Sequence, residues 1–215
     1  AIDELTAKYN PRVVLVYSTC IVGVIGDDLD AVCKAAAKKH GIDVIPVQSS
    51  GFIGNKAGGY RAACDVLMRL ITPQDGKMLP KKENTLNYLG DFNLAGEAWI
   101  INNYFKAMGV EMNVAFTGDS SYDAIKQATS ASLNIIQCAG SMVTLAEKMK
   151  DQFGIPFMHI SFLGLDDTAD SLRRIAAHFG DERMQERTEQ LIAREDANVR
   201  PIIESYRQKF AGKKA

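Results

Sequence analysis

The stretch RVVLVY, residues 12–17, is a short run of mostly β-branched apolar residues, a composition typical of a strand buried on both faces. A helix is expected to begin at Asp28, capped by Asp27 or Asp28, and residues 42–47 form the next expected strand. The expected helix has one apolar stripe at helical spacing, made of Leu29, Val32, Cys33 and Ala36. Strand, amphipathic helix and strand form the repeating unit of a parallel sheet, so the sequence predicts an α/β fold.

The same alternation continues along the chain. Further strands are expected at residues 85–89, 110–116, 133–137 and 157–162, and helices at residues 60–71, 95–108, 122–129, 142–153 and 168–179. Residues 72–83 contain two prolines, a glycine and clustered charge, which is typical of a linker. We predict two Rossmann-like parallel-sheet units, in residues 1–82 and 83–180. A charged connecting helix in residues 181–215 follows, which Pro201 is expected to kink or restart.

Composition excludes several classes of partner. The chain has 215 residues, of which 47% are hydrophobic, and its formal net charge is -1 with no block of like charges. We therefore expect no nucleic-acid partner and no membrane partner. No apolar run approaches the roughly 20 residues of a membrane helix, and residues 1–10 lack a signal-peptide core, so we expect a cytoplasmic protein.

Four cysteines are dispersed through the chain without a CxxC pair, so buried thiols or metal ligands are favoured over disulfides. Cys20 and Cys138 directly follow expected strands, where ligands of open α/β sheets bind. Cys138 also precedes a helix, whose N–H groups favour a thiolate that could bind a soft metal. From the residues alone, both could equally be small buried side chains. Cys33 and Cys64 fall on helix stripes and are expected in the core.

A glycine-rich loop at residues 51–59 contains Asn55, Lys56 and Gly59 and leads to Tyr60. Glycines let the backbone approach a ligand closely, and a lysine beside them suits an anion, although a plain surface turn explains the same pattern. Three other features are given structural roles. Trp99 is expected to pack within a helix, the aspartates near residue 28 to cap one, and the three histidines to bind no metal, since they lack ligand spacing.

Five segments, taken in order, resemble the nitrogenase component 1 family. They are VYSTCIVGVIGDDLDAVC, PVQSSGFIGNKAGGY, NYLGDFNLAGEAW, LNIIQCAGSM and FGIPFMHISFLGLDDTADSLRRIA. The resemblance implies that Cys20 is a ligand of an iron–sulfur cluster shared with a homologous subunit, and that Cys138 is the cofactor cysteine. The two cysteine roles agree with the thiolate preference of iron–sulfur clusters. The resemblance also implies that Asn55, Lys56, Gly59 and Tyr60 contact the cofactor.

Differences from the family pattern indicate which kind of family member the chain resembles. Tyr60 stands where catalytic subunits carry a cofactor histidine, and Gly140 stands where they carry an arginine. The resemblance therefore implies an assembly scaffold of the E type, which holds an iron–sulfur precursor of the iron-molybdenum cofactor, rather than an enzyme that turns over. Family members also have cluster cysteines upstream of Cys20 and a third domain after Phe210. We expect the chain to be a fragment that binds clusters weakly or not at all by itself.

The implied partners are a homologous N-type scaffold subunit in a heterotetramer and an ATP-dependent iron protein that supplies electrons. Two alternatives stay open. One is a catalytic α-type subunit of an alternative nitrogenase or a nitrogenase-like reductase. The other is an α/β module that binds a small anion or a nucleotide, which is weakly supported because neither unit contains GxGxxG opening a helix.

Overall fold

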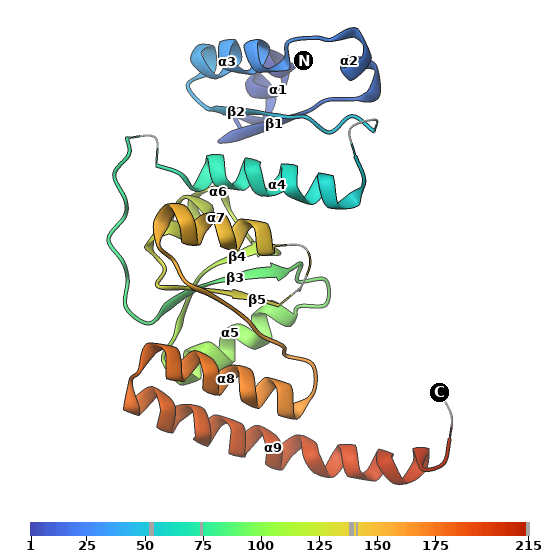
Figure 1. The fold of residues 1–215 in the computed structure, drawn as a ribbon, viewed down its shortest axis with the longest axis vertical. Coiled ribbons are helices and arrows are strands. Elements are labelled where there is room, and N and C mark those ends of the chain that lie inside the picture. Colours follow the sequence, from blue (N-terminus) through green and yellow to red (C-terminus); the bar gives the residue numbers. More distant parts are fainter. Residues whose placement is uncertain (52–53, 74, 138–139, 141, 214–215) are drawn as a thin grey trace.

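Two separate parallel sheets, each covered by helices, make up the chain (Figure 1). This computed structural model describes residues 1–51, 54–73, 75–137, 140 and 142–213. The α/β class with parallel sheets predicted from the sequence is confirmed. No helix of the described residues is both long enough and apolar enough to cross a lipid bilayer.

The first sheet is small. Strands β1 (Val13–Tyr17) and β2 (Asp43–Val47) pair in parallel, with Val13 opposite Asp43 and Tyr17 opposite Val47. Three helices accompany them: α1 (Ile2–Tyr9), α2 (Cys20–Ile25) and α3 (Leu29–His40). A small core forms where Cys33 and Ala36 of α3 pack with Val14 and Val44 of the strands. As predicted, Asp28 caps α3 by accepting a hydrogen bond from the Ala31 N–H at 2.9 Å.

The second sheet has four strands in the order β4-β3-β5-β6 and carries most of the core. These strands are β3 (Thr85–Asp91), β4 (Glu111–Thr117), β5 (Leu133–Ile136) and β6 (Phe157–His159). The helices of this part are α5 (Glu97–Met108), α6 (Tyr122–Lys126), α7 (Val143–Phe153), α8 (Leu165–Phe179) and α9 (Glu182–Phe210), with a 3-10 turn at Ala128–Ser130. Every residue of β3 is buried, because α5 and α8 cover one face of this sheet and α7 covers the other (Figure 1).

Helix α4 (Lys56–Ile71) lies between the two sheets and packs against both (Figure 1). Its Cys64, Met68 and Ile71 belong to the core that α4 and α7 form with one face of the second sheet. Its Val66 and Leu70 instead pack with Ile45 and Val47 of β2. Because these two sets of residues point to opposite faces of one helix, α4 holds the two sheets together.

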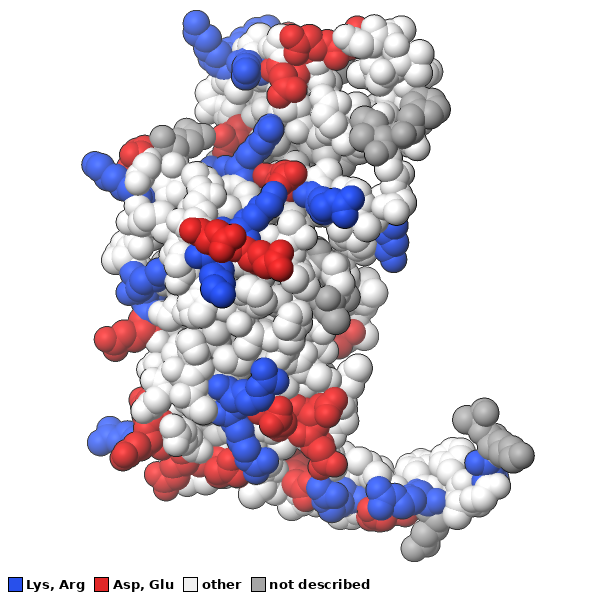
Figure 2. All heavy atoms as spheres, viewed as in Figure 1, with Lys and Arg blue, Asp and Glu red and all other residues white. Residues whose placement is uncertain are grey.

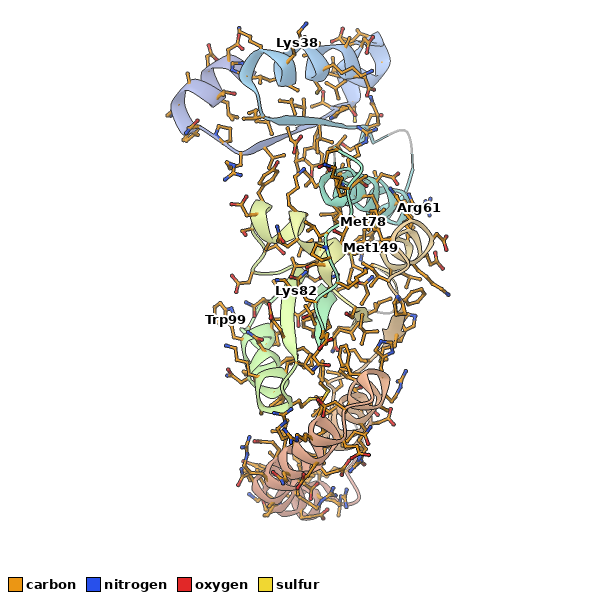
Figure 3. All side chains as sticks on the ribbon, turned by 90° about the vertical axis from the view of Figure 1, so that its left-hand side faces the viewer. Lys38, Arg61, Met78, Lys82, Trp99 and Met149 are labelled. Atoms are coloured by element: carbon orange, nitrogen blue, oxygen red, sulfur yellow. The ribbon has the colours of Figure 1, made fainter. Side chains whose placement is uncertain are left out.

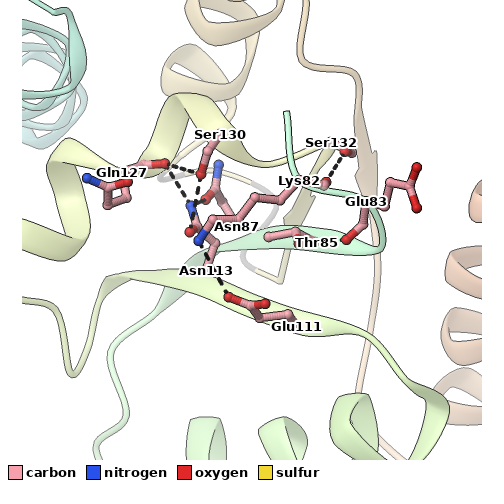
Figure 4. Close-up of polar contacts among 9 residues, drawn as sticks. All are labelled: Lys82, Glu83, Thr85, Asn87, Glu111, Asn113, Gln127, Ser130 and Ser132. Atoms are coloured by element: carbon pink, nitrogen blue, oxygen red, sulfur yellow. Dashed lines mark hydrogen bonds and ion pairs between the residues drawn. The ribbon is translucent and has the colours of Figure 1, made fainter. Parts of the chain in front are cut away.

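Asparagine side chains cross-link three strands inside the second sheet, and Figure 4 shows the part of these contacts around Asn87 and Asn113. The amide nitrogen of buried Asn87 in β3 donates to Asn134 of β5 at 2.8 Å and to the carbonyl of Ala128 at 2.9 Å. The amide nitrogen of Asn113 in β4 donates back to Asn87 at 3.0 Å. The hydrogen bond between Asn113 and Asn87 lies at an irregularity of the sheet, because the register between β3 and β4 shifts between Leu86 and Asn87.

Several sequence expectations are corrected. Pro201 does not restart the helix, because α9 runs through it as one element. The carbonyl of Ala197 that loses a helix hydrogen bond there belongs to an exposed residue, so water can satisfy it. Val32, expected on the buried stripe of α3, is 53% exposed because the two-stranded sheet covers only a narrow face. Helices α1 and α2 were not expected, and α4 begins at Lys56 rather than at residue 60.

Trp99 also differs from expectation. Its side chain is 60% exposed on α5 (Figure 3), and its indole N–H donates to Asp119 at 2.7 Å. The inward face of α5 is already filled by Ala98, Ile101 and Phe105, which leaves the indole on the surface.

Candidate functional site

Cys20 is the first residue of α2 and lies just beyond the carboxyl end of β1. Its side chain is exposed, and its Sγ accepts a hydrogen bond from the Gly51 N–H at 3.4 Å. Buried Ser18 fixes the chain nearby, because its hydroxyl accepts from the Ser49 N–H at 2.8 Å. The loops after β1 and β2 are thus tied together, and they present one thiol to the outside.

The surface beside Cys20 is apolar. Ile21, Val24 and Ile25 of α2 are 73%, 72% and 64% exposed. The opposite side of α2 packs so closely on the second loop that a Cβ at Gly23 would come within 2.9 Å of Ser50. A rigidly held helix that exposes several large apolar side chains is characteristic of a protein interface.

The buried cysteines contrast with Cys20. Cys33 and Cys64 are each 1% exposed, as predicted for core residues. Burial raises the pKa of both thiols, which keeps them protonated and disfavours metal binding. Among the residues that the structure describes, no group of three His, Cys, Asp or Glu side chains lies close enough to hold a metal ion.

The predicted glycine loop is in large part the first turn of α4. Asn55 caps this helix, since its side-chain oxygen accepts from the Gly58 N–H at 3.2 Å. Exposed Lys56 places its Nζ 5.7 Å from the ring centre of half-buried Tyr60. Asn55, Lys56 and Tyr60 therefore form one group at the N-terminus of α4, beside the exposed backbone of Gly59.

Cys138 lies outside the described residues, but the elements on either side of it are defined. Strand β5 ends at Ile136, and the N–H of Gln137 donates to the carbonyl of Leu89 at 3.0 Å. After this segment, Met142 is 3% exposed and packs in the core just before α7.

Helices α4 and α7 lie side by side and run in the same direction. Asp65 forms an ion pair with Lys148, and further along both helices Gln152 donates to Thr72 at 3.4 Å. The N-termini of the two helices are consequently at the same end of the pair. The structure thus brings the Asn55–Tyr60 group to the end of the second sheet at which Gln137 and Met142 lie.

One ordered feature of this sheet edge was not assigned a role from the sequence. Asp91, at the end of β3, is 8% exposed and accepts hydrogen bonds from the Tyr88 hydroxyl at 2.8 Å and the Asn93 N–H at 2.5 Å. Burial raises the pKa of Tyr88, so its hydroxyl stays a donor. The Gly-Asp-Phe-Asn motif, residues 90–93, which ends the strand and begins the following turn, was the available signal, since short polar side chains there often order a turn.

Comparison with known proteins gives a consistent picture. The profile of the family described as "Nitrogenase component 1 type Oxidoreductase" matches residues 1–215. The chain is 52% identical over 215 residues to the nitrogenase iron-molybdenum cofactor biosynthesis protein NifE of Clostridium pasteurianum, covering 100% of this chain and 46% of that protein. It is 48% identical over 223 residues to NifE of Methanosarcina barkeri, covering 100% of this chain and 48% of that protein.

A solved structure titled "Nitrogenase Cp1 at pH 5" superposes with a TM-score of 0.92 at 33% identity, over 99% of this chain and 43% of that one. The chain spans less than half the length of the curated relatives described above. Since the family profile covers every residue, the chain belongs to the nitrogenase component 1 family.

Proposed function

We propose that this chain takes part in building the nitrogenase iron-molybdenum cofactor, as a subunit of a scaffold that holds an iron–sulfur precursor. The observation that carries the proposal is the 52% identity, along the whole chain, to a protein named for the biosynthesis of that cofactor. Identity to the solved nitrogenase is lower, at 33%, which favours the scaffold over a catalytic subunit. The proposal places the complex in the cytoplasm.

Cys20 would hold one iron of a cluster shared with a homologous N-type subunit in a heterotetramer. The support for a shared cluster comes from coordination chemistry. Iron–sulfur clusters are commonly held by four cysteine thiolates, and Cys20 is the only exposed cysteine in the described part of the chain. The remaining ligands must come from outside the described residues. The exposed apolar side chains Ile21, Val24 and Ile25 surround the thiol with the kind of surface that a partner subunit covers.

Cys138 would anchor the precursor, with Asn55, Lys56, Gly59 and Tyr60 along one side of it. Exposed Lys56 supplies positive charge to an anionic cluster, and the N-terminus of α4 adds the partial positive charge of the helix dipole. The phenol of Tyr60 can donate one hydrogen bond, and it stands where catalytic subunits of the family carry a histidine, the side chain most often used to move protons at neutral pH. Such a site suits holding a precursor better than delivering protons to a substrate. Electrons would come from an ATP-dependent iron protein.

The three parts expected from the sequence, residues 1–82, 83–180 and 181–215, would then have separate tasks. The first carries the shared cluster and one side of the precursor site, the second carries the cysteine that anchors the precursor, and the third extends from the second. Helix α4 contributes to the cores on both sides, so it would keep the distance between the two sites constant.

The test uses the full-length protein purified without oxygen together with its partner. We expect Cys138→Ser to remove the precursor's share of iron and to abolish the ability of the complex to activate a nitrogenase that lacks its cofactor. Cys64→Ser, which changes a buried core cysteine, is the matched control and should preserve both. Dinitrogen reduction by the complex itself would instead establish the catalytic alternative.

A further inference from the structure

Asp91 is the only Asp, Glu, Lys, Arg or His residue that is buried in the described part of the chain, at 8% exposure. Figure 2 shows the more common arrangement on the face viewed there, where Asp and Glu side chains lie at the surface, many of them beside Lys or Arg. Moving a carboxylate out of water is costly unless a cation or hydrogen bonds compensate it. The surroundings of Asp91 must therefore account for its charge.

These surroundings hold the carboxylate in place without neutralising it. It accepts hydrogen bonds from the Tyr88 hydroxyl at 2.8 Å and from the Asn93 N–H at 2.5 Å. Both donors are uncharged groups, and among the described residues no Lys, Arg or His forms an ion pair with this carboxylate. The edge of the second sheet thus contains a fixed negative charge that no neighbouring cation cancels.

The ends of β3 and β4 determine where this charge lies. The register between the two strands shifts between Leu89 and Asp91, and Gly90 between them has a φ of 87°, so a bulge turns the carboxylate to the side of Tyr88. The carbonyl of Asp91 accepts from the Gly118 N–H at 3.0 Å. A Cβ at Gly118 would overlap the turn that follows β3, so the two turns are in close contact. The charge is therefore held rigidly.

This rigid charge lies beside the strand that leads to Cys138. Strand β5 pairs with β3 in parallel, with Leu89 opposite Ile136, and the Gln137 N–H donates to the Leu89 carbonyl at 3.0 Å. Asp91 is two residues beyond Leu89, as Cys138 is two residues beyond Ile136. Neighbouring strands are about 4.8 Å apart. The buried charge is thus at the sheet edge, and on the strand next to β5, where the precursor is proposed to bind.

We propose that the buried charge of Asp91 lowers the reduction potential of the precursor. Reduction adds an electron to the cluster, and a fixed negative charge nearby opposes it, because the protein interior screens charge less than water does. The precursor then stays oxidised until a strong one-electron reductant acts on it. This inference rests on the proposed function, since it concerns the cluster that Cys138 anchors.

The test is a redox titration of the full-length protein, purified without oxygen together with its partner. A low-potential chemical reductant supplies the electrons through mediators, and the part of the visible absorption that Cys138→Ser removes reports on the precursor. Asp91→Asn should raise the midpoint potential of this component. The amide keeps the shape of the side chain, and it can accept from the Asn93 N–H and donate to the Tyr88 oxygen, so the charge alone is lost. An unchanged or lowered midpoint potential overturns the inference.

Two matched variants separate the charge from the structure around it. Tyr88→Phe removes a hydrogen bond from the same carboxylate but keeps the charge, so it should not raise the midpoint potential. Asp119→Asn neutralises an exposed carboxylate in the turn after β4, where water screens the charge, and should shift the potential less than Asp91→Asn does. A rise in either variant equal to that in Asp91→Asn would overturn the role of the buried charge.

Asp91→Ser is a second neutral variant, whose hydroxyl can also accept a hydrogen bond, and it should raise the potential in the same direction. Neither neutral variant should lose the precursor, because removing a negative charge favours an anionic cluster. Loss of the precursor from both would therefore overturn the inference. A complex of the unchanged protein without any iron that depends on Cys138 would instead refute the proposed function. Such iron with a midpoint potential that ignores Asp91→Asn would refute this inference alone.

Discussion

The two sheets of this chain differ in how far each is stabilised by its own residues. The second sheet is covered on both faces, and Leu86, Tyr88 and Leu89 of its central strand are fully buried. The first sheet has two strands, and its residues Leu15 and Tyr17 are 38% and 60% exposed. A sheet this small buries too little apolar area to be stable alone. The difference suggests that the second sheet is the folding framework, whereas the first depends on α4 and on surfaces outside the chain.

The largest effect is expected in the core of the second sheet. Phe116→Ala removes a fully buried ring from the core shared with α4 and α7, and should lower the free energy of unfolding by about 3–5 kcal/mol. Urea denaturation of the purified chain measures this change. Phe92→Ala, at a residue 42% exposed, is the control and should cost far less. Equal losses in the two variants would show that the second sheet is not the framework.

A smaller but more local effect is expected where α4 meets the first sheet. Leu70 is 4% exposed and packs with Ile45 and Val47, so Leu70→Ala should cost about 2–3 kcal/mol. Hydrogen exchange should show β1 and β2 losing protection while β3 and β5 keep theirs. Uniform loss across both sheets would mean that they unfold as one unit.

The hydrogen bonds between asparagine side chains in the second sheet should contribute less to the free energy of unfolding than these apolar contacts. Asn87→Ala leaves the buried side-chain oxygen of Asn134 without the donor that it has in the structure, and should cost about 1–3 kcal/mol through the loss of buried hydrogen bonds. Thermal melts measure the destabilisation. Asn103→Ala, an exposed asparagine on α5, serves as the control. An unchanged melting temperature for Asn87→Ala would show that these contacts do not stabilise the sheet.

The smallest effect is expected at the start of α4. Asn55→Ala removes the cap from the Gly58 N–H and should cost about 1 kcal/mol. Asn55→Asp keeps an accepting oxygen and should retain most of the stability, as chemical denaturation would report. If both substitutions behave alike, the capping assignment is wrong.

The sequence predicted the parts of the fold that depend on local pattern. Strands such as Val13–Tyr17 and Leu133–Ile136 stand out as short, mostly apolar runs, although only the second is buried along its whole length, whereas Leu15 and Tyr17 of the first are exposed. Cys33 and Cys64 were correctly assigned to the core because they fall on the apolar stripes of expected helices. The position of Cys20 beyond β1 followed from the predicted end of that strand. Cys20 was chosen as a candidate because ligands bind at the carboxyl ends of parallel strands.

The missed features depend on contacts between distant residues. Helix α2 has only six residues, too few for a periodic pattern, and its apolar side chains face outward rather than into this chain. The contact between Asn87 and Asn134 requires knowing that β3 and β5 are neighbours in the sheet. Trp99 was misplaced because composition does not reveal which face of α5 is already full.

We propose that Cys20, exposed beside an apolar surface, is a cluster ligand, whereas Cys33, buried in the same sheet unit, is a core residue. The most direct measurement is the iron and acid-labile sulfide content of the full-length protein, purified without oxygen with its partner, in Cys20→Ser and Cys33→Ser forms. We predict that Cys20→Ser loses the iron of one cluster while Cys33→Ser keeps it. Unchanged iron in Cys20→Ser would contradict the account.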